Sequence, residues 1–549
     1  MLAGLRLMTT PWVRRAARAA PAAPAAQLRT SAGRRSGAPP ARDGDELSQP
    51  LEPADARAFW DNMRPGAQPT GALSAQAAGE LRGAVEAVVR RRAHNGAVAM
   101  EQRTQQCCDQ YEALDAAGRG AFLRMLAHEF CAPKGPALEA ARAYVASAAR
   151  ARDPAQCAPL ARALRDGLTP QYTELFDQIN RLPGGFAFLV RMRGDMLALL
   201  RTAVAREDPP TRAMSDALKM KLETWIIGTL ELKRITWNSP ACTIEKLGQY
   251  ETVHAVRSWL DVKRRLGSAR RCFGFFHRSV PMEPLVFVWV ALTDGISDNV
   301  QAILREREPP PPLHAEAAAT CAVFYSINSQ PGLSGVDLGN FLIKRVVAVL
   351  RAELPAVDTF CTLSPLPRFR AWLDQWLTPE RIAAPPAGGD GDDDDVAVPP
   401  AAQQRLTALV PGAATWTAAL ARTIDARGWA SDPALLAAME PVVCALGAHY
   451  LVRAKRPGAA TAAYDPVANF HLRNGACLHR INWRGNTSYS GLRQSLGLMC
   501  NYNYVLSRIE DNNERYVRDG SIAVSGSDPF IARAMSASPA PPPPPPARL

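Results

Sequence analysis

"AVFYSINSQPGLSGVDLGNFLIKRVV" is the sequence of residues 322–347, where a β-branched and aromatic run leads into a glycine-rich turn and then a helical pattern. Gly332, Gly335 and Gly339 permit tight turns and close approach of the backbone to a ligand. In this order of strand, loop and helix, the N–H groups of the loop and of the helix start form an anion site. No Lys-Ser or Lys-Thr follows the glycines, so this is not a Walker A loop. An ordinary strand–helix turn is the alternative interpretation.

Other short runs rich in β-branched and aromatic residues lie on both sides of this loop, and helical patterns separate them. The runs are EPLVFVWVALTD (283–294), ATCAVFYSIN (319–328), TFCTLSPLP (359–367) and ACLHRINW (476–483). Helical periodicity appears in NFLIKRVVAVLRAEL (340–354) and PALLAAMEPVVCALGAHYLV (433–452). Alternating strands and helices predict an α/β domain, which we place at residues 226–530.

Upstream of residue 226 the patterns are helical, and no strand pattern intervenes. GELRGAVEAVVRRRAHN (79–95) places Leu81, Val85, Val88 and Val89 near one face. Pro183-Gly184-Gly185 breaks a later helical stretch into two. ALKMKLETWIIGTLELKRITW (217–237) is interpreted as one further long helix. The sequence therefore predicts an all-helical domain at residues 76–225, and the fold class is multidomain, α followed by α/β.

Three segments lie outside these domains. Residues 1–42 are rich in arginine and free of acidic residues, which is typical of a mitochondrial transit peptide, and residues 43–75 are interpreted as a linker. Residues 385–402 are rich in Gly, Pro and Asp and predict a solvated loop insertion; they lack the spacing of a calcium-binding EF-hand loop. Residues 531–549 are interpreted as a proline-rich tail.

Composition argues against several classes of protein. The eight arginines of residues 1–42 account for eight of the twelve net positive charges, and no aromatic-and-basic pattern accompanies the remainder, so nucleic-acid binding is not expected. The longest apolar run, PLVFVWVAL (284–292), is too short to span a membrane. The eleven cysteines are scattered without a CxxC motif, which argues against a zinc module and a disulfide scaffold. We expect no nucleic acid, no membrane span and no metal.

Two further stretches carry side chains that suit proton chemistry. Ser364 follows a short predicted strand and precedes Pro365, where a reactive serine and a simple turn both fit. His471 and His479 lie in NFHLRNGACLHRINW (469–483). His479 falls inside a predicted strand, where histidines are usually structural. His471 falls in the predicted loop before that strand, a position that favours proton transfer.

Taken together, these stretches resemble the malonyl-CoA decarboxylase family. The resemblance runs through FDQINRLPGGFAFLVRMRGDMLALLR, ITWNSPA, YETVHAVRSWLDVKRRLGSARRCFGFFHRSVPMEPL, FYSINSQPGLSGVDLGNFLIKRVV, LSPLPRF, NFHLRNGACLHRINW and SGLRQSLGLMCNYNY, in that order. It implies an N-terminal helical bundle and a GNAT-like α/β catalytic domain that binds acyl-CoA. It also implies a carboxy-lyase of fatty-acid metabolism that converts malonyl-CoA to acetyl-CoA and CO2 without a cofactor.

The resemblance also assigns site residues. Ser364, in the LSP turn, and His471, in NFHL, match the catalytic serine and histidine of the family. The acyl-CoA loop matches Ser334, Gly335, Val336, Asp337, Leu338, Gly339 and Asn340. His471 is expected to protonate the enolate carbon, and Ser364 to accept a proton or to contact the malonyl carboxylate.

The resemblance further implies a homotetramer. The arginine-rich residues 1–42 predict a location in the mitochondrial matrix, with peroxisome and cytoplasm as further compartments, and the resemblance supports mitochondria and peroxisomes. Ala547-Arg548-Leu549 is similar to a Ser-Lys-Leu signal, so a peroxisomal import receptor is an expected partner. Two alternatives stay open at this point. One is a GNAT-type acyl-CoA acyltransferase, and the other is a helical interaction protein with an inactive α/β domain.

Overall fold

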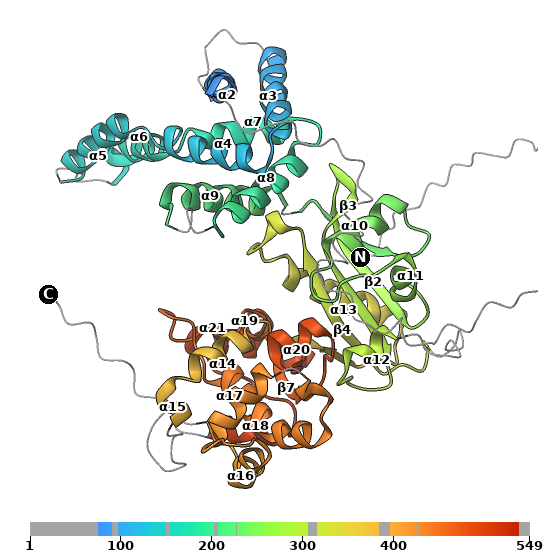
Figure 1. Cartoon of the computed structure of the whole chain (residues 1–549). Coiled ribbons are helices and arrows are strands. Elements are labelled where there is room, and N and C mark those ends of the chain that lie inside the picture. The colour runs from blue at the N-terminus through green and yellow to red at the C-terminus, as the bar shows by residue number, and fades with distance from the viewer. Residues whose placement is uncertain are drawn as a thin grey trace, which may run out of the picture. The chain divides into compact units, whose positions relative to one another are not determined.

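The described residues between 75 and 226 form helices and no strands, as the periodicity predicts (Figure 1). The computed structural model describes residues 75–89, 97–149, 154–202, 207–226, 228–305, 316–383, 396–426 and 428–536. The helices are α2 (Ala75–Val89), α3 (Ala97–Glu112), α4 (Ala116–Glu129), α5 (Lys134–Ala148), α6 (Ala158–Leu168), α7 (Tyr172–Arg181), α8 (Gly185–Leu199) and α9 (Pro209–Ile226). The predicted leader, nearly all of the linker, most of the acidic insertion and the end of the tail lie outside the described residues.

The predicted break at Pro183-Gly184-Gly185 separates α7 from α8. Gly184 adopts a φ of 73°, in the left-handed region that glycine tolerates. The interpretation of residues 217–237 as one helix is wrong in its second half. Helix α9 ends at Ile226, Gly228 has a φ of 77°, and Leu230–Ile235 forms strand β1. The glycine ends the helix, and the following residues gain hydrogen bonds by pairing with a neighbouring strand.

A mixed sheet forms the centre of the second half. The strands are β2 (Arg270–His277), β3 (Val280–Thr293), β4 (Cys321–Ser329), β5 (Thr359–Thr362), β6 (Ser364–Pro365), β7 (Cys477–Asn482) and β8 (Met499–Asn503). Their order is β1-β2-β3-β4-β5-β8-β6, with β7 also paired to β8. Only β4 and β5 run parallel, and helix α13 (Leu338–Glu353) connects them as a crossover. The strands predicted from the four apolar runs are all present.

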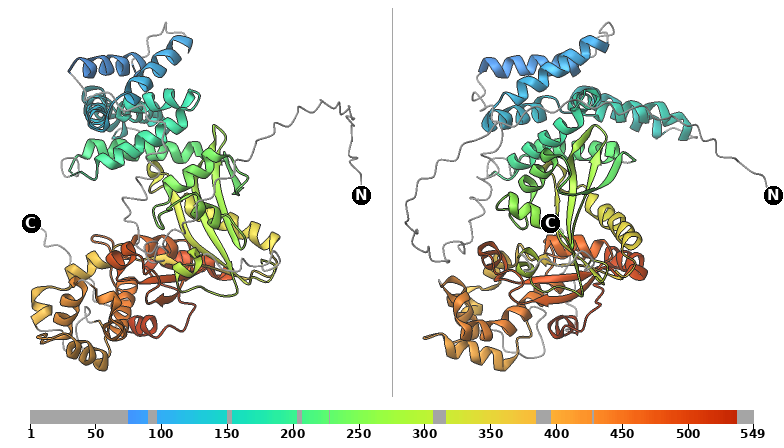
Figure 2. Two further views of the ribbon diagram at one scale, coloured as in Figure 1. Left: turned by 45° about the vertical axis from the view of Figure 1, so that its right-hand side comes forward. Right: turned by 90° about the vertical axis from the view of Figure 1, so that its right-hand side faces the viewer.

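Alternate residues of the central strands bury opposite faces of the sheet. In β3, Phe287 and Trp289 pack with residues of α10 (Ala241–Tyr250) and α12 (Val300–Leu304), whereas Val286 and Val288 belong to the core that includes α13. Helix α11 (Trp259–Arg265) packs near β2. Figure 2 shows helices on both sides of these strands. Burial of both faces explains why the run is continuously apolar rather than alternating.

Residues 369–536 add further helices to the part of the sheet formed by β7 and β8. These are α14 (Phe369–Trp376), α15 (Pro379–Ala383), α16 (Pro400–Leu409), α17 (Trp416–Asp425), α18 (Pro433–Val452), α19 (Pro466–Arg473), α20 (Tyr489–Ser495), α21 (Ile509–Asp519) and α22 (Pro529–Ser536). Among the described helices, α18 alone is long and apolar enough to cross a membrane, and about two thirds of its apolar window is buried inside the protein. That burial is what a core helix of a globular domain shows.

Two predicted segment boundaries differ from the structure. Residues 400–402 of the predicted insertion begin α16, where Ala402 is buried. Residues 531–536 of the predicted tail belong to α22, and Ile531 is fully buried. In both places an apolar residue beside a proline-rich stretch joins the core, and composition alone did not indicate this.

Helix α8 and the glycine loop approach each other at backbone distance. A Cβ on Gly332 would lie 1.7 Å from the carbonyl oxygen of Val190. Arg193, which is 3% exposed, donates from Nη1 to the carbonyl oxygen of Gly332, from Nη2 to that of Ser334 at 3.0 Å, and from Nε to that of Ser215 at 3.2 Å. The helical part of the chain thus fixes the course of the loop.

We predict that Gly332→Ala destabilises the protein by about 3 kcal/mol or more, because the added methyl group meets backbone atoms that cannot turn aside. Urea denaturation of the purified variant measures the loss. Gly83→Ala in α2 is the control, since its Cβ would have no neighbour within 4 Å; we expect a small gain in stability there. Equal stability of the wild type and the Gly332 variant would contradict the close approach.

Candidate active site

A cavity of about 570 Å³ opens where two strands of the sheet separate. The parallel pairing of β4 with β5 ends at Phe324 and Thr362. Beyond this point β4 continues to Ser329, while Ser364 pairs with Cys500 of β8. The carboxyl ends of the two strands therefore diverge, and the space between them is the position in which open α/β sheets bind ligands.

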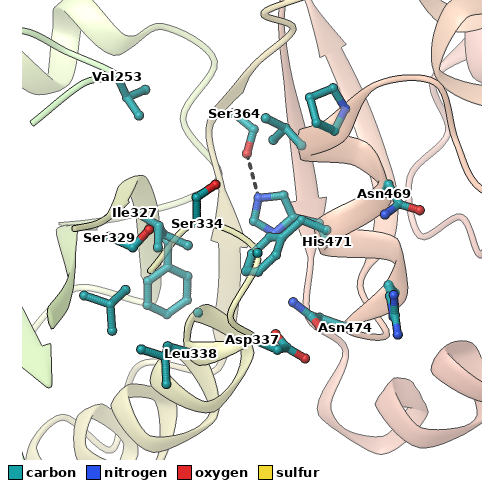
Figure 3. A pocket seen from close by; sticks show the side chains of 18 of the residues that line it. Val253, Ile327, Ser329, Ser334, Asp337, Leu338, Ser364, Asn469, His471 and Asn474 are labelled. Carbon is teal, nitrogen blue, oxygen red and sulfur yellow. Dashed lines mark hydrogen bonds between the residues drawn. The ribbon is translucent and has the colours of Figure 1, made fainter. Parts of the chain in front are cut away.

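Figure 3 shows the residues that meet in this cavity. The glycine loop and the end of β4 form one side, and Ser364 and helix α19 form the other. Six of the seven predicted loop residues line the cavity: Ser334, Gly335, Val336, Asp337, Leu338 and Gly339. The seventh, Asn340, lies in the first turn of α13. The folded chain therefore brings together stretches that lie more than a hundred residues apart in the sequence.

Ser364 and His471 are in contact inside the cavity. Ser364 Oγ lies 3.2 Å from His471 Nε2, and each residue is 4% exposed. On its other side, Ser364 donates a hydrogen bond to Thr362 Oγ1 at 2.8 Å. His471 Nδ1 lies 2.8 Å from the hydroxyl of Tyr504. A continuous chain of polar contacts thus runs from Thr362 to Tyr504.

The direction of these hydrogen bonds assigns the tautomer of His471. The Ser364 hydroxyl hydrogen points to Thr362, so Nε2–H of His471 is the donor to Ser364. Nδ1 then accepts from the hydroxyl of Tyr504, and burial raises the pKa of that hydroxyl. Burial also lowers the pKa of His471 to about 3. The imidazole is therefore neutral near pH 7, with its proton on the nitrogen that faces the serine.

His471 lies in a helix, and the prediction of a loop at this position is wrong. Helix α19 spans Pro466–Arg473, and the buried carboxylate of Asp465 caps it by accepting from the N–H groups of Val467 and Ala468 at 2.8 and 2.9 Å. The hydroxyl of Tyr450 also donates to Asp465, at 2.8 Å. A capped helix holds the imidazole in one place more firmly than a loop would.

Packing fixes the orientation of the imidazole ring. It stacks on Tyr502, with ring centroids 4.8 Å apart, and meets the edge of Phe470 at 5.0 Å. Phe470 in turn packs against the start of α13, where a Cβ on Gly339 would lie 2.6 Å from its ring. Gly339 therefore allows the helix that carries His471 to touch the loop helix.

A buried carboxylate organises the opposite side of the cavity. Glu251 accepts hydrogen bonds from Ser326 Oγ and Asn328 Nδ2 of β4 and from the N–H groups of Val253 and His254. Ser326 and Val253 line the cavity. No cation pairs with Glu251 among the salt bridges of the described residues, so the carboxylate is held by these neutral donors.

His479 lies apart from this site. It is inside β7, as predicted, and its Nδ1 lies 3.1 Å from Ser525 Oγ. The cavity-lining residues do not include it. Of the two histidines only His471 lines the cavity, and their separate roles stay a prediction.

Sequence reasoning missed several side chains of the site. The sequence patterns did not single out four of them: Thr362, Tyr504, Glu251 and Arg193. Only Thr362 had a signal, since it lies two residues before Ser364 and so on the same side of an extended chain. In the parts of the chain that the structure covers, no three His, Cys, Asp or Glu side chains gather in a group that could hold a metal ion.

We predict that His471 makes the protein less stable in acid. The unfolded chain binds a proton at His471 below about pH 6.5, but the folded chain does so only near pH 3. Stability is therefore lost as the pH falls below 6.5, by about 2 kcal/mol at pH 5. Urea denaturation at pH 5 and pH 7.5 measures the loss, which His471→Gln should reduce.

His254→Gln is the matched comparison, because burial also lowers the pKa of His254 to about 3, and this residue does not line the cavity. We expect the same reduction in that variant. A pH dependence unchanged by His471→Gln would contradict a neutral, buried imidazole.

Comparison with known proteins identifies the family. Two family models match the chain: the malonyl-CoA decarboxylase N-terminal domain over residues 133–225 and the C-terminal domain over residues 228–537. The chain is 37% identical over 428 residues to "Malonyl-CoA decarboxylase, mitochondrial" of Anser anser anser, covering 77% of this chain and 82% of that protein. It is 37% identical over 413 residues to the Rattus norvegicus protein of the same name, covering 75% of this chain and 81% of that protein.

Solved structures give the same result. The crystal structure of malonyl-CoA decarboxylase from Rhodopseudomonas palustris has a TM-score of 0.68 and 35% identity, over 82% of this chain and 98% of that chain. The Agrobacterium vitis structure has a TM-score of 0.67 and 32% identity, over 83% and 99%. One family model matches more than half of this chain, and the relatives above are more than 30% identical to it. The chain therefore belongs to the malonyl-CoA decarboxylase family.

Proposed function

We propose that this protein decarboxylates malonyl-CoA to acetyl-CoA and CO2. The observation that supports this most is the buried contact between Ser364 and His471, which lies beside the glycine loop in a member of this family. Such a site can hold an acyl-CoA by its phosphates on the loop side and handle a proton on the other side. The acyltransferase alternative also needs a second, amine substrate.

The reaction needs two services from the protein. When the bond between the carboxylate carbon and the α-carbon breaks, its electron pair moves into the thioester and forms an enolate. CO2 leaves, and one proton must then be added to the α-carbon. Hydrogen-bond donors aimed at the enolate oxygen lower the barrier by about 3–4 kcal/mol each, and a positioned acid adds about 100- to 10,000-fold.

His471 is the proposed proton donor. Without a substrate charge beside it, its imidazole is neutral, because burial lowers its pKa to about 3. The malonyl carboxylate brings a negative charge into the same desolvated space, and an opposite charge raises the pKa of a histidine. The imidazolium that forms beside the substrate can give its Nε2 proton to the α-carbon once CO2 has left. The proton that makes the imidazolium goes onto Nδ1, so the Tyr504 hydroxyl changes from donor to acceptor and stays in contact with the ring.

Ser364 is the proposed polar partner of the malonyl group. Its hydroxyl already has two neighbours, Thr362 Oγ1 and His471 Nε2, so its rotation between them and the substrate requires no backbone movement. An isolated serine is a weak base. A role as donor to the carboxylate, or as relay for the His471 proton, therefore suits it better than proton abstraction.

The catalytic assignment predicts a clear ranking of variants. His471→Ala should lower kcat by at least about 100-fold while malonyl-CoA still binds, since only the proton donor is lost. Ser364→Ala should also lower kcat strongly with little effect on folding, because it removes a single oxygen. Release of acetyl-CoA and CO2 from malonyl-CoA by the purified variants measures both effects.

His479→Ala is the control, because His479 lies outside the cavity. Its kcat should stay close to that of the wild type if the variant is folded. Equal losses in folded His471 and His479 variants would refute the assignment. Absence of acetyl-CoA formation by the wild type would refute the function itself.

The location of the protein is a separate proposal. The related proteins of Anser anser anser and Rattus norvegicus are named mitochondrial, and residues 1–42 have the composition of a transit peptide. We therefore place the protein in the mitochondrial matrix. A peroxisomal fraction, delivered by an import receptor through Ala547-Arg548-Leu549, and a cytoplasmic fraction remain predictions from the sequence. A homotetrameric assembly remains a prediction from the family resemblance.

Fluorescent reporters test the two ends of the chain. Residues 1–42 fused ahead of a reporter should direct it to mitochondria. The last twelve residues fused behind a reporter should direct it to peroxisomes, and the same fusion without Leu549 should stay diffuse. Diffuse fluorescence from both tail reporters would remove peroxisomes from the proposal and leave the leader result unaffected.

A further inference from the structure

Helix α9 of the N-terminal helical part contributes two charged side chains to the cavity. Lys219 and Glu223 line it together with the loop and His471. Lys219 Nζ lies 3.6 Å from Glu223 Oε1, and the two side chains are about one third exposed, 33% and 39%. A pair at this distance and exposure stabilises the helix weakly, so the ammonium group can turn to a stronger acceptor at little cost.

Lys219 also lies directly over the glycine loop. Gly335 adopts a φ of 81°, and an added Cβ would have Nζ of Lys219 as its nearest neighbour, at 3.9 Å. The ammonium group is therefore within reach of any ligand atom that settles on this part of the loop.

The loop presents a free donor at the same place. Arg193 donates a hydrogen bond from Nη2 to the carbonyl oxygen of Ser334 at 3.0 Å. The N–H of Gly335 belongs to the same planar peptide and lies opposite that oxygen, so it points away from Arg193. Within the described part of the chain, that N–H has no acceptor. An unpaired amide donor and an ammonium group at one edge of a cavity form a site for an anionic oxygen.

The charges around the cavity support the same conclusion. Its lining holds two basic side chains, Lys219 and Arg473, and two acidic ones, Glu223 and Asp337. Coenzyme A carries a diphosphate and a ribose phosphate, so an acyl-CoA brings several negative charges to a lining that has no net charge of its own. The charge of the lining does not change when Lys219 turns; the gain is that its ammonium group exchanges a weak contact with Glu223 for a charge-assisted hydrogen bond to a phosphate oxygen.

We propose that Lys219 binds a phosphate group of the coenzyme A portion of the substrate, together with the N–H of Gly335. The helical part of the chain thereby takes part directly in substrate recognition, and Glu223 holds the ammonium group in place while the site is empty. This inference rests on the proposed function, because that function supplies a phosphate-bearing thioester as the ligand.

A pair of substrates separates this role from a structural one. Malonyl-CoA carries the phosphates, whereas malonyl-pantetheine has the same reacting atoms and none of the phosphates. Lys219→Ala should raise KM for malonyl-CoA about 10-fold, the loss expected for one charge-assisted hydrogen bond, with kcat little changed. kcat/KM for malonyl-pantetheine should stay within about twofold of the wild type.

Two more variants sharpen the test. Lys219→Arg keeps the charge and should recover most of the affinity for malonyl-CoA. Lys221→Ala removes a lysine two positions along the same helix, whose ammonium group is bonded to Asp177 at 2.7 Å, and should leave KM for both substrates unchanged. Raised salt should weaken malonyl-CoA binding to the wild type more than to Lys219→Ala, because salt screens an exposed ionic contact.

Three results would overturn the inference: no change in KM for malonyl-CoA, equal losses with both substrates, or no rescue by arginine. Calorimetric binding of coenzyme A itself to the wild type and Lys219→Ala keeps this test independent of turnover. If the wild type binds coenzyme A but does not decarboxylate malonyl-CoA, the proposed function fails. The Lys219 inference would then be judged by the difference in binding alone.

Discussion

The separation of β4 from β6 is the constraint on which the site depends. Paired strands leave no room for a ligand between them, because their backbones lie about 5 Å apart. Here the pairing of β4 with its parallel neighbour stops at Phe324, and the chain beyond Thr362 turns to pair with β8 instead. The carboxyl end of β4 then leads into the glycine loop, while Ser364 is carried to the other side of the gap. The cavity and the positions of the loop and of Ser364 on its two sides follow from this change of pairing, from β4 to β8.

Burial gives the site its chemical state. A histidine in water is partly charged near neutral pH, but the ring of His471 is enclosed by Tyr502 and Phe470 and is neutral. The proposed substrate is itself an anion, and under the proposed function its charge raises the pKa of the ring. The same low polarity that disfavours a charge on the isolated ring would strengthen the attraction between imidazolium and carboxylate. A site of this kind can take up a proton when substrate binds rather than hold it beforehand.

The helical part of the chain belongs to the site as much as the sheet does. Arg193 of α8 holds two carbonyl groups of the loop, and the missing side chain of Gly332 lets the helix backbone approach. Because those carbonyl groups point toward α8, the N–H groups of the same peptides point away from it. Shape and polarity of the loop thus depend on a helix that lies more than a hundred residues earlier in the sequence.

By itself, the sequence determined most of the order of elements, and its family resemblance pointed to Ser364 and His471, which the fold brings into contact. Strands of β-branched residues, the loop with Gly335 and Gly339, and the place of His479 inside a strand followed from local pattern, because burial and turn formation act over a few residues. It did not determine that residues 230–235 form an edge strand, since a short polar strand exists only through its neighbour. Nor could it place Tyr504 on His471 or Arg193 on the loop. Those contacts join segments 33 and about 140 residues apart, and only the folded chain decides which distant side chains share one buried space.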